Sequence, residues 1–240
     1  MVDVATSARS TDLQASGCAV ARPISPQLSS ELLQAESSAR SIRPVGGLLK
    51  RGLDLLIAFA MMPVLLPLLA CIAFAVRLES KGPALFRQRR GGFRGRTFII
   101  YKFRTMTALE DGQSVQQAKR GDSRITNLGA VLRKTSLDEL PQLINVLRGE
   151  MSFVGPRPHA LAHDKTFIAV EPDYVRRFEA RPGITGLAQT SGSRGPTDTP
   201  ESVRERIAFD LAYIDSWSPW LDVKIVARTA LGCLWDKNAF

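Results

Sequence analysis

The sequence has few of the residues that build disulfide frameworks and zinc sites, with three cysteines and two histidines in 240 residues. Cys18, Cys71 and Cys233 are odd in number and scattered, which excludes a disulfide framework and gives no zinc-type spacing. His159 and His163 stand four residues apart, but without another histidine or an HExxH motif they do not make a zinc site. These absences are typical of a domain in a reducing cytoplasm.

Blocks of one charge sign are also lacking, with one exception. Between Arg77 and Arg104 the chain has nine basic residues and one acidic residue, so this block carries eight of the nine net positive charges. Because the block directly follows the most apolar segment, we expect it to meet anionic lipid headgroups, at about 1 kcal/mol per basic side chain. A nucleic-acid-binding patch is the alternative, and the adjacent apolar segment argues against it.

One long apolar run is present, from Leu55 to Val76, with 22 residues and no charge. A helix of this length spans about 30 Å of hydrocarbon. Pro63 and Pro67 lie in the middle of the run. Since a proline inside a helix removes a backbone donor and bends the helix, a straight membrane span is not expected.

Basic residues flank the apolar run on both sides, at Lys50, Arg51 and Arg77. Lys and Arg prefer the cytoplasmic side of a membrane, so two basic flanks give no asymmetry that would orient a crossing. We therefore favour a proline-broken, re-entrant membrane helix over about residues 53–77. A kinked single span and a buried helix of a soluble protein are the alternatives.

The segment from Pro83 to Met106 predicts a β-hairpin. Two runs rich in apolar and aromatic residues, ALFRQ and TFIIYKF, are joined by the basic, Gly-rich turn RRGGFRGR. We expect this turn to rest on lipid headgroups, because no helix follows it as in a dinucleotide-binding loop. Lys102 and Arg104 end the second strand and are candidate phosphate ligands.

Two adjacent carboxylates, Asp138 and Glu139, stand among basic residues between Thr135 and Pro158. Ser136 and Glu139 match a capping box, and the helix dipole favours acids in a first turn, so capping alone would explain both acids. Pro141 argues against a regular helix start and predicts an irregular turn. The alternative is catalysis, with the carboxylates binding Mg²⁺ together with substrate phosphates.

Several segments together resemble one family: KRGLD at 50–54 with the apolar run after it, YKFRTM at 101–106, SLDELPQLINVLRGEMSFVGPRP at 136–158 and RPGITG at 181–186. Over about residues 48–235 the sequence resembles, in order and spacing, the bacterial sugar transferases. These are monotopic phosphoglycosyl transferases that start lipid-linked glycan assembly, as in exopolysaccharide biosynthesis. The central motif is long enough to make the resemblance specific.

The resemblance implies transfer of a sugar 1-phosphate from a nucleotide sugar to undecaprenyl phosphate, with release of a nucleoside monophosphate. It implies that Asp138 attacks the β-phosphate and forms a covalent phosphosugar intermediate, and that Glu139 acts beside it with Mg²⁺. A carboxylate nucleophile divides one difficult displacement into two easier ones, which predicts ping-pong kinetics.

Three arginines are candidate phosphate or nucleotide ligands: Arg133, Arg157 and Arg194. A guanidinium binds two phosphate oxygens at once, although a salt bridge or a headgroup contact is the alternative for each. The segment GPRPHALAHD at 155–164 resembles the subset of the family that transfers glucose 1-phosphate. By this analogy we favour UDP-glucose over UDP-galactose.

Two helices are predicted near the C-terminal end of the sequence. Thr199-Pro200-Glu201 caps a helix that runs to about Ser216, and Ser218-Pro219 starts another. Five residues of the second helix follow a helical stripe: Trp220, Val223, Ala227, Leu231 and Leu234. Tryptophan favours the membrane interface, which indicates a helix lying on the bilayer; packing of the stripe into the protein core is an equal alternative.

We therefore expect a mostly helical α+β protein with a disordered tail over residues 1–47 and a sugar transferase domain over 48–240. The catalytic part, over about 83–240, is expected to be small and cytosolic, to include the hairpin, and to be anchored by the re-entrant helix and by interfacial amphipathic helices. Four residues are assigned to the membrane anchor: Lys50, Arg51, Pro63 and Pro67.

The expected location is the bacterial inner membrane, with the catalytic part at the cytoplasmic face. The expected partners are a UDP-sugar, undecaprenyl phosphate and anionic lipids, without nucleic acid, and a homo-oligomer is a possible assembly. The rival from another class is a non-catalytic membrane scaffold, in which the basic block holds lipids and the acids only cap a helix.

Overall fold

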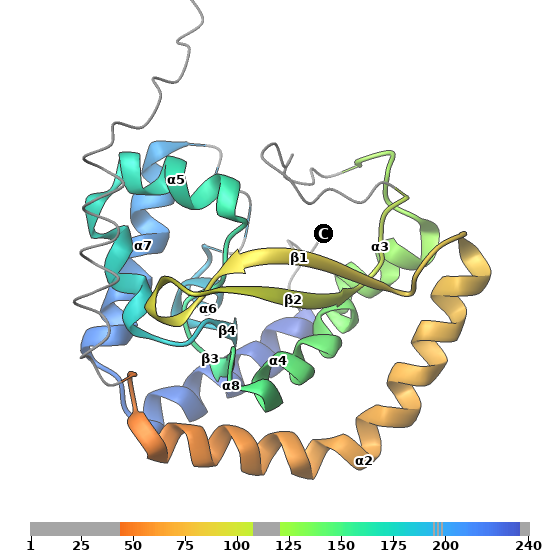
Figure 1. Cartoon of the computed structure of the whole chain (residues 1–240), viewed down its shortest axis with the longest axis horizontal. Helices are drawn as coiled ribbons and strands as arrows, with labels where there is room; N and C mark the ends of the chain where they lie inside the picture. Colours follow the sequence, from red (N-terminus) through yellow and green to blue (C-terminus); the bar gives the residue numbers. More distant parts are fainter. Residues whose placement is uncertain (1–43, 108–120, 194, 196, 198, 236–240) are drawn as a thin grey trace, which may run out of the picture.

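A computed structural model describes residues 44–107, 121–193, 195, 197 and 199–235. Most of the predicted tail lies outside the described residues. The described part is mostly helical and α+β, with two small two-stranded sheets and one long apolar helix (Figure 1). The predicted fold class is confirmed at this level.

The apolar run forms helix α2, Gly47–Glu79, with Pro63 and Pro67 inside it. Figure 1 shows that α2 bends about halfway along, so that its two halves follow two sides of the molecule. Interior prolines are a known cause of such a bend, because each removes one hydrogen bond of the helix. By length and composition α2 could cross a membrane, and only 11% of its most apolar 18-residue window is buried. The buried soluble helix is therefore the wrong alternative, since most apolar side chains of α2 face outward.

The predicted hairpin is confirmed. Strand β1, Leu85–Gly91, pairs antiparallel with β2, Thr97–Phe103, and a 3₁₀ turn, η1, Phe93–Gly95, joins them. Part of the Gly-rich turn is buried in the protein, whereas Arg89 and Arg96 of the same turn are exposed. Gly91 is buried against Asp164 and Phe178, where a Cβ atom would come within 2.5 Å of the Asp164 carboxylate.

A second sheet brings together two motifs that are far apart in sequence. Strand β3, Ser152–Val154, pairs in parallel with β4, Gly183–Thr185. Directly after β3, Gly155 packs so closely on the backbone of the second motif that a Cβ on Gly155 would lie 2.3 Å from the Arg181 carbonyl oxygen. Only glycine fits this approach, so the chain GPRP is held against RPGITG.

The remaining elements surround these two sheets: α3 Asn127–Lys134, η2 Leu137–Gln142, α4 Leu143–Arg148, α5 Leu161–Val170, η3 Pro172–Glu179, α6 Leu187–Thr190, α7 Pro200–Asp215 and α8 Pro219–Trp235. One core cluster joins the first half of α2 to β2 and α4 through Ala58, Phe98, Leu143 and Val146. A second joins its other half to β2 and α3 through Ile72, Val76, Phe103 and Leu132. The bent helix is thus packed against the hairpin region on both sides of its prolines.

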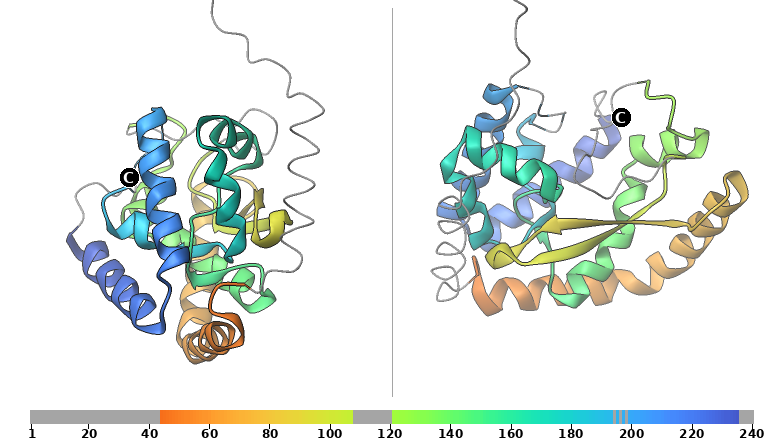
Figure 2. Two further views of the ribbon diagram at one scale, coloured as in Figure 1. Left: turned by 90° about the vertical axis from the view of Figure 1, so that its left-hand side faces the viewer. Right: turned by 45° about the horizontal axis from the view of Figure 1, so that its top comes forward.

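The two predicted C-terminal helices are confirmed as α7, which Thr199 caps with a capping box, and α8. The apolar stripe on α8 faces outward: Trp220 is 65% exposed and Leu231 is 58% exposed, whereas Ile225 on another face is buried. Packing of the stripe into the core is therefore the wrong alternative. Figure 2 shows α8, in dark blue, on the same lower side of the molecule as the first half of α2, in orange.

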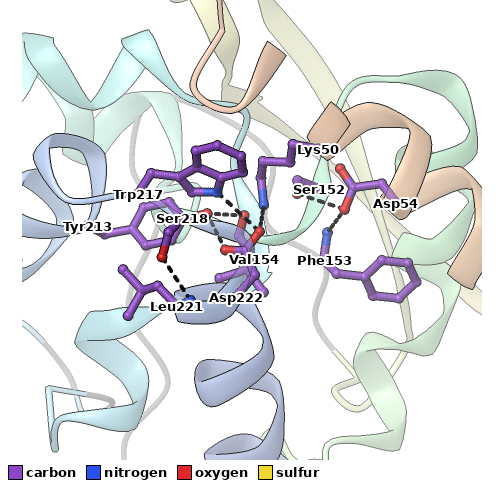
Figure 3. A network of polar contacts seen from close by, with 10 residues as sticks. All are labelled: Lys50, Asp54, Ser152, Phe153, Val154, Tyr213, Trp217, Ser218, Leu221 and Asp222. Atoms are coloured by element: carbon purple, nitrogen blue, oxygen red, sulfur yellow. Dashed lines mark hydrogen bonds and ion pairs between the residues drawn. The ribbon is translucent and has the colours of Figure 1, made fainter. Parts of the chain in front are cut away.

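A buried polar network fixes α8 to the start of α2 (Figure 3). Asp222 of α8 accepts three hydrogen bonds, from Lys50 Nζ at 2.5 Å, Tyr213 Oη at 2.8 Å and Trp217 Nε1 at 3.2 Å. One turn further along α2, Asp54 accepts from the Ser152 hydroxyl at 2.9 Å. The carboxylates of the two helices thus tie the apolar surfaces to the rest of the fold.

Lys50 and Arg51, which the sequence placed among the membrane-anchor residues, make their contacts inside the protein. Lys50 is 5% exposed and its ammonium group pairs with Asp222. Arg51 donates to the carbonyl oxygens of Val146 and Leu147, at the end of α4, at 2.5 and 3.0 Å. Both cations therefore attach α2 to neighbouring helices, and their assignment to the membrane anchor is corrected to contacts within the protein.

Candidate active site

The two adjacent acids lie in η2, a 3₁₀ helix that also contains Pro141. Ser136, just before it, has a φ of 57° and makes no side-chain capping hydrogen bond. The predicted irregular turn is confirmed. The capping-box explanation is wrong, because the Glu139 carboxylate turns away from the helix start and binds two cations instead. Asp138 and Glu139 are thus positioned by a turn whose geometry differs from a regular helix start.

Glu139 joins two candidates that are distant from it in sequence. Lys102, at the end of β2, places Nζ 2.8 Å from Oε1 of Glu139. Arg157, in the GPRP segment after β3, donates to Oε1 at 2.6 Å and to Oε2 at 3.3 Å. Burial opposes ionisation of Glu139, but the charges of Arg157 and Lys102 outweigh it and hold the pKa of this carboxyl well below its usual range. Glu139 is therefore ionised and paired at neutral pH.

Asp138 lies in a different electrostatic environment, although it is the next residue. It is 8% exposed, and burial raises the pKa of its carboxyl to about 6, against the lowering effect of Lys102 and with the help of the negative charge of Glu139. Two neighbouring acids with pKa values pushed apart are typical of catalytic pairs, in which each acid has its own role.

Arg133 lies in the last turn of α3, near enough for its charge to lower the pKa of Asp138. Its buried Nε has no hydrogen-bond partner among the described residues. The structure thus brings Lys102, Arg133 and Arg157 around the acidic pair, and a ligand with several anionic oxygens would find cations on more than one side.

Arg104 is placed elsewhere. It is 3% exposed, and its guanidinium donates to the carbonyl oxygens of Ser80 at 2.6 Å, Lys81 at 3.0 Å and Val76 at 3.3 Å. Val76 lies in the last turn of α2, and Ser80 and Lys81 directly follow the helix end, where carbonyl groups lack partners within the helix. Arg104 therefore caps α2 and is not available as the phosphate ligand that the sequence suggested. Arg194 lies outside the described residues.

The protein side chains supply only some of the ligands that a magnesium ion needs. The described residues contain no group of three or more His, Cys, Asp or Glu side chains that could enclose a metal. Mg²⁺, however, is commonly held by one or two carboxylates together with substrate phosphates, and keeps several waters. Asp138 and Glu139 supply such a pair beside a cationic site, so the residues present fit Mg²⁺ that arrives with a phosphorylated substrate.

Sequence reasoning missed a buried network behind Arg157. Arg177, Asp210 and Tyr174 are almost fully buried and form one set of polar contacts with His159. The sequence alone does not show that these side chains are buried. His159 was weighed as a zinc ligand and as part of the GPRPHALAHD segment that resembles glucose 1-phosphate transferases, and neither interpretation predicted this network.

Comparison with known proteins gives a consistent result. The family described as bacterial sugar transferase matches residues 45–236. The UDP-glucose:undecaprenyl-phosphate glucose-1-phosphate transferase of Caulobacter vibrioides is 51% identical over 218 residues, which cover 91% of this chain and 82% of that protein. The protein of the same name from Escherichia coli is 48% identical over 82% of this chain.

A relative with another printed sugar is also similar. The UDP-N-acetylgalactosamine-undecaprenyl-phosphate N-acetylgalactosaminephosphotransferase of Aeromonas hydrophila is 42% identical over 78% of this chain. The matched region is 42% of the Escherichia coli protein and 44% of the Aeromonas protein, so this chain spans less than half of their lengths. Because the family matches nearly the whole described chain, including both acids and their cations, this protein belongs to the bacterial sugar transferases.

Proposed function

We propose that this protein transfers a sugar 1-phosphate, with glucose 1-phosphate favoured, from a UDP-sugar to undecaprenyl phosphate and releases UMP. Galactose 1-phosphate is the alternative sugar. The observation that carries the proposal is the pair of adjacent acids with opposite pKa shifts, set among Lys102 and Arg157. The 51% identity to the Caulobacter glucose-1-phosphate transferase supports both the reaction and the favoured sugar.

Asp138 is the proposed nucleophile. With a pKa of about 6 its carboxylate is ionised at pH 7.5, yet burial has left it more basic than an ordinary aspartate. One carboxylate oxygen attacks the β-phosphorus of the UDP-sugar while the bond from that phosphorus to the bridging oxygen breaks. The bridging oxygen leaves with UMP, and the sugar phosphate stays on Asp138 as an acyl phosphate.

The second displacement regenerates the enzyme. An oxygen of undecaprenyl phosphate attacks the same phosphorus, and the bond from phosphorus to the Asp138 oxygen breaks, which returns the carboxylate and yields the lipid-linked diphosphate sugar. Division into two displacements is the general benefit of a covalent intermediate. It predicts ping-pong kinetics.

The cations around the acids stabilise the transferring group. Glu139 holds Lys102 and Arg157 at 2.8 and 2.6 Å, so the fold itself places both cations beside the acids. Preorganised donors aimed at developing charge are usually the largest catalytic contribution. Arg133, on α3, adds a third positive charge near the two acids. When bound, Mg²⁺ held by Asp138 and Glu139 would neutralise charge on the diphosphate oxygens.

The membrane arrangement is part of the proposal, because the second substrate is a lipid. The outward side chains of α2 and the exposed stripe of α8 are proposed to enter the bacterial inner membrane from its cytoplasmic face, with α2 re-entrant and α8 interfacial. In support, Leu56, Val64 and Phe74 of α2 are 67%, 73% and 66% exposed, which in water would leave a large apolar surface uncovered. Arg87 and Arg89 on the hairpin remain exposed and suit anionic headgroups.

The decisive experiment measures UMP release by detergent-purified protein given UDP-glucose, Mg²⁺ and undecaprenyl phosphate. We expect release by the wild type and a loss of at least about 1,000-fold in Asp138→Asn, because the nucleophile is removed. Asp173→Asn is the matched control, since Asp173 also lies in the first turn of a 3₁₀ helix but is exposed. Activity retained in Asp138→Asn would refute the assignment, and no UMP from any nucleotide sugar would favour a membrane scaffold.

The re-entrant topology has its own test. Single cysteines are introduced at Leu48 and Lys81, both exposed and on either side of the apolar helix, in a background where Cys18, Cys71 and Cys233 are replaced by alanine. We expect both to react with a membrane-impermeant thiol reagent from the cytoplasmic side only. Labelling of the two positions from opposite sides would show a kinked single span instead.

A further inference from the structure

The main chain that carries Arg157 is held by two other arginines. Arg177 of η3 donates from Nη2 to the carbonyl oxygen of Arg157 at 2.6 Å. Arg90 of β1 donates from Nη1 to the carbonyl oxygen of Pro158 at 2.9 Å. Two consecutive carbonyl groups are thus fixed from two different elements, and the GPRP segment cannot rotate without losing one of these bonds.

Arg177 uses each of its three guanidinium nitrogens for a different partner. Besides the Arg157 carbonyl, Nε donates to Asp210 Oδ2 at 2.8 Å and Nη1 lies 3.1 Å from Nδ1 of His159. Arg177 is 5% exposed and Asp210 is 1% exposed. A planar, charged fork is needed to reach three fixed partners in three directions, which a lysine ammonium on a flexible stem cannot do.

His159 supports this arrangement as a neutral acceptor. Burial and the positive charge of Arg177 hold the pKa of its imidazole well below the usual range. Since an arginine nitrogen only donates, Nδ1 of the neutral ring accepts from Arg177. Tyr174, whose hydroxyl is 2.9 Å from the same Nδ1, donates to the Asp164 carboxylate. The network behind the GPRP segment is therefore packed, buried and rigid.

We propose that Arg177 is a positioning residue for Arg157. It fixes the backbone at Arg157, with Asp210 as its counter-ion, so that the Arg157 side chain reaches Glu139 before substrate binds and a phosphate oxygen afterwards. The phosphate contact of Arg157 rests on the proposed function, whereas the positioning of Arg157 against Glu139 does not. Arg90 acts at the neighbouring carbonyl in the same way.

The test is a double-mutant cycle on UMP release with UDP-glucose and undecaprenyl phosphate. Arg177→Lys keeps the charge beside Asp210 but loses the fork, and we expect kcat/KM to fall about 30-fold, as for a misplaced catalytic group. In an Arg157→Lys background the same change is expected to cost less than about threefold, because Arg177 acts through Arg157. Arg90→Lys, on a less buried arginine, is expected to show the same dependence on Arg157.

Arg176→Lys is the matched control. Arg176 is the preceding residue, pairs with Asp215 at 2.6 Å on the surface and does not contact the GPRP segment in the described structure, so kcat/KM should stay within about twofold. Melting temperatures are measured for every variant. Equal losses from Arg177→Lys with and without Arg157→Lys would mean a general structural role and would overturn the proposal.

A structure of the Arg177→Lys variant tests the positioning of Arg157 independently of the reaction. If the wild type releases no UMP, the proposed function fails, and the position of Arg157 is then decided by a cryo-EM or crystal structure of Arg177→Lys. We expect the Arg157 guanidinium to have left Glu139 in that variant. If it still binds Glu139 at the wild-type distance, Arg177 does not position it.

Discussion

Two pairs of acidic residues in this protein have similar side chains and different roles. Asp222 and Asp54 form the pair that ties helices α2 and α8 to the fold, and both accept hydrogen bonds from the protein around them (Figure 3). Glu139 and Asp138 form the other pair, in which Glu139 is bound by two cations and Asp138 keeps a pKa of about 6. The pairs differ in their surroundings: the first joins helices of the scaffold, whereas in the second Asp138 is buried beside the negative charge of Glu139 and the cations Lys102 and Arg157.

One residue type thus supports structure in one place and chemistry in another. A carboxylate whose oxygens are bound by fixed donors holds those donors, and the elements that carry them, together. A buried carboxylate beside another negative charge gains basicity at a cost in stability, and such a cost is tolerated at functional sites. Substitutions in each pair test this difference.

After the loss of the nucleophile in Asp138→Asn, the largest effect on activity is expected at Glu139. Glu139→Gln keeps the shape but removes the charge that holds Lys102 and Arg157, so kcat/KM for UMP release should fall about 300-fold, a typical loss for disrupted electrostatic preorganisation. Glu201→Gln, an exposed acid in the first turn of α7, is the control and should stay near wild type. A loss of less than about threefold in Glu139→Gln would mean that the cations are positioned without it.

Substitution in the pair formed by Asp222 and Asp54 should lower stability and not act on the chemical step. Asp222→Asn leaves the buried Lys50 without its counter-ion, which should lower the free energy of unfolding by about 3 kcal/mol. Asp215→Asn breaks the exposed pair with Arg176 and should cost less than about 1 kcal/mol. Both are measured by thermal unfolding in detergent or nanodiscs. An unchanged melting temperature in Asp222→Asn would show that the clamp between α2 and α8 contributes little.

Asp138→Asn should raise stability while it abolishes activity. The folded-state pKa is raised from 3.8 to about 6, so the ionised carboxylate destabilises the fold at neutral pH, and its removal should add about 3 kcal/mol. The gain should be complete above about pH 6, shrink between pH 6 and 4, and vanish below, where both folded and unfolded carboxyls are protonated. Melting curves over that range test it, and a lower melting temperature at pH 7.5 would contradict the raised pKa.

The smallest effect concerns the pH dependence of the reaction. Attack requires ionised Asp138, so kcat/KM for the UDP-sugar should fall about tenfold for each pH unit below about 6 and level off above it. Asp173→Asn should follow the same curve. A profile that stays flat down to pH 5 would show that the free enzyme's nucleophile has an ordinary carboxyl pKa.

The sequence predicted the parts of this site whose chemistry is local. Asp138 and Glu139 are neighbours in the chain, and Pro141 was enough to predict an irregular turn, because its missing amide disturbs the helix wherever the rest of the chain lies. Lys102 and Arg157 were predicted as separate candidates. That both would meet on Glu139 depended on the hairpin and on the glycine contact between the GPRP and RPGITG segments, which no local pattern contains.

Other predictions were wrong for a related reason. Arg104 and Lys50 belong to basic stretches beside the membrane segment, and the sequence assigned Arg104 to phosphate and Lys50 to the membrane anchor. Burial assigns them instead to the carbonyl groups that end α2 and to Asp222. The sequence does not show whether a charged side chain is buried. A count of charges therefore cannot distinguish a cation that binds a ligand from one that stabilises the packing of a helix.

The sequence by itself determined the bent apolar helix, the hairpin, the two C-terminal helices and the identity of the acidic pair, because prolines, alternating apolar residues, caps and adjacent acids act over a few residues. The tertiary structure alone decided which face of α8 is exposed, which cations reach Glu139, and why Asp138 has a raised pKa. It also decided that Arg177, from a segment with no motif, holds the backbone of Arg157. These outcomes depend on burial and on contacts between distant segments, and both exist only once the chain has folded.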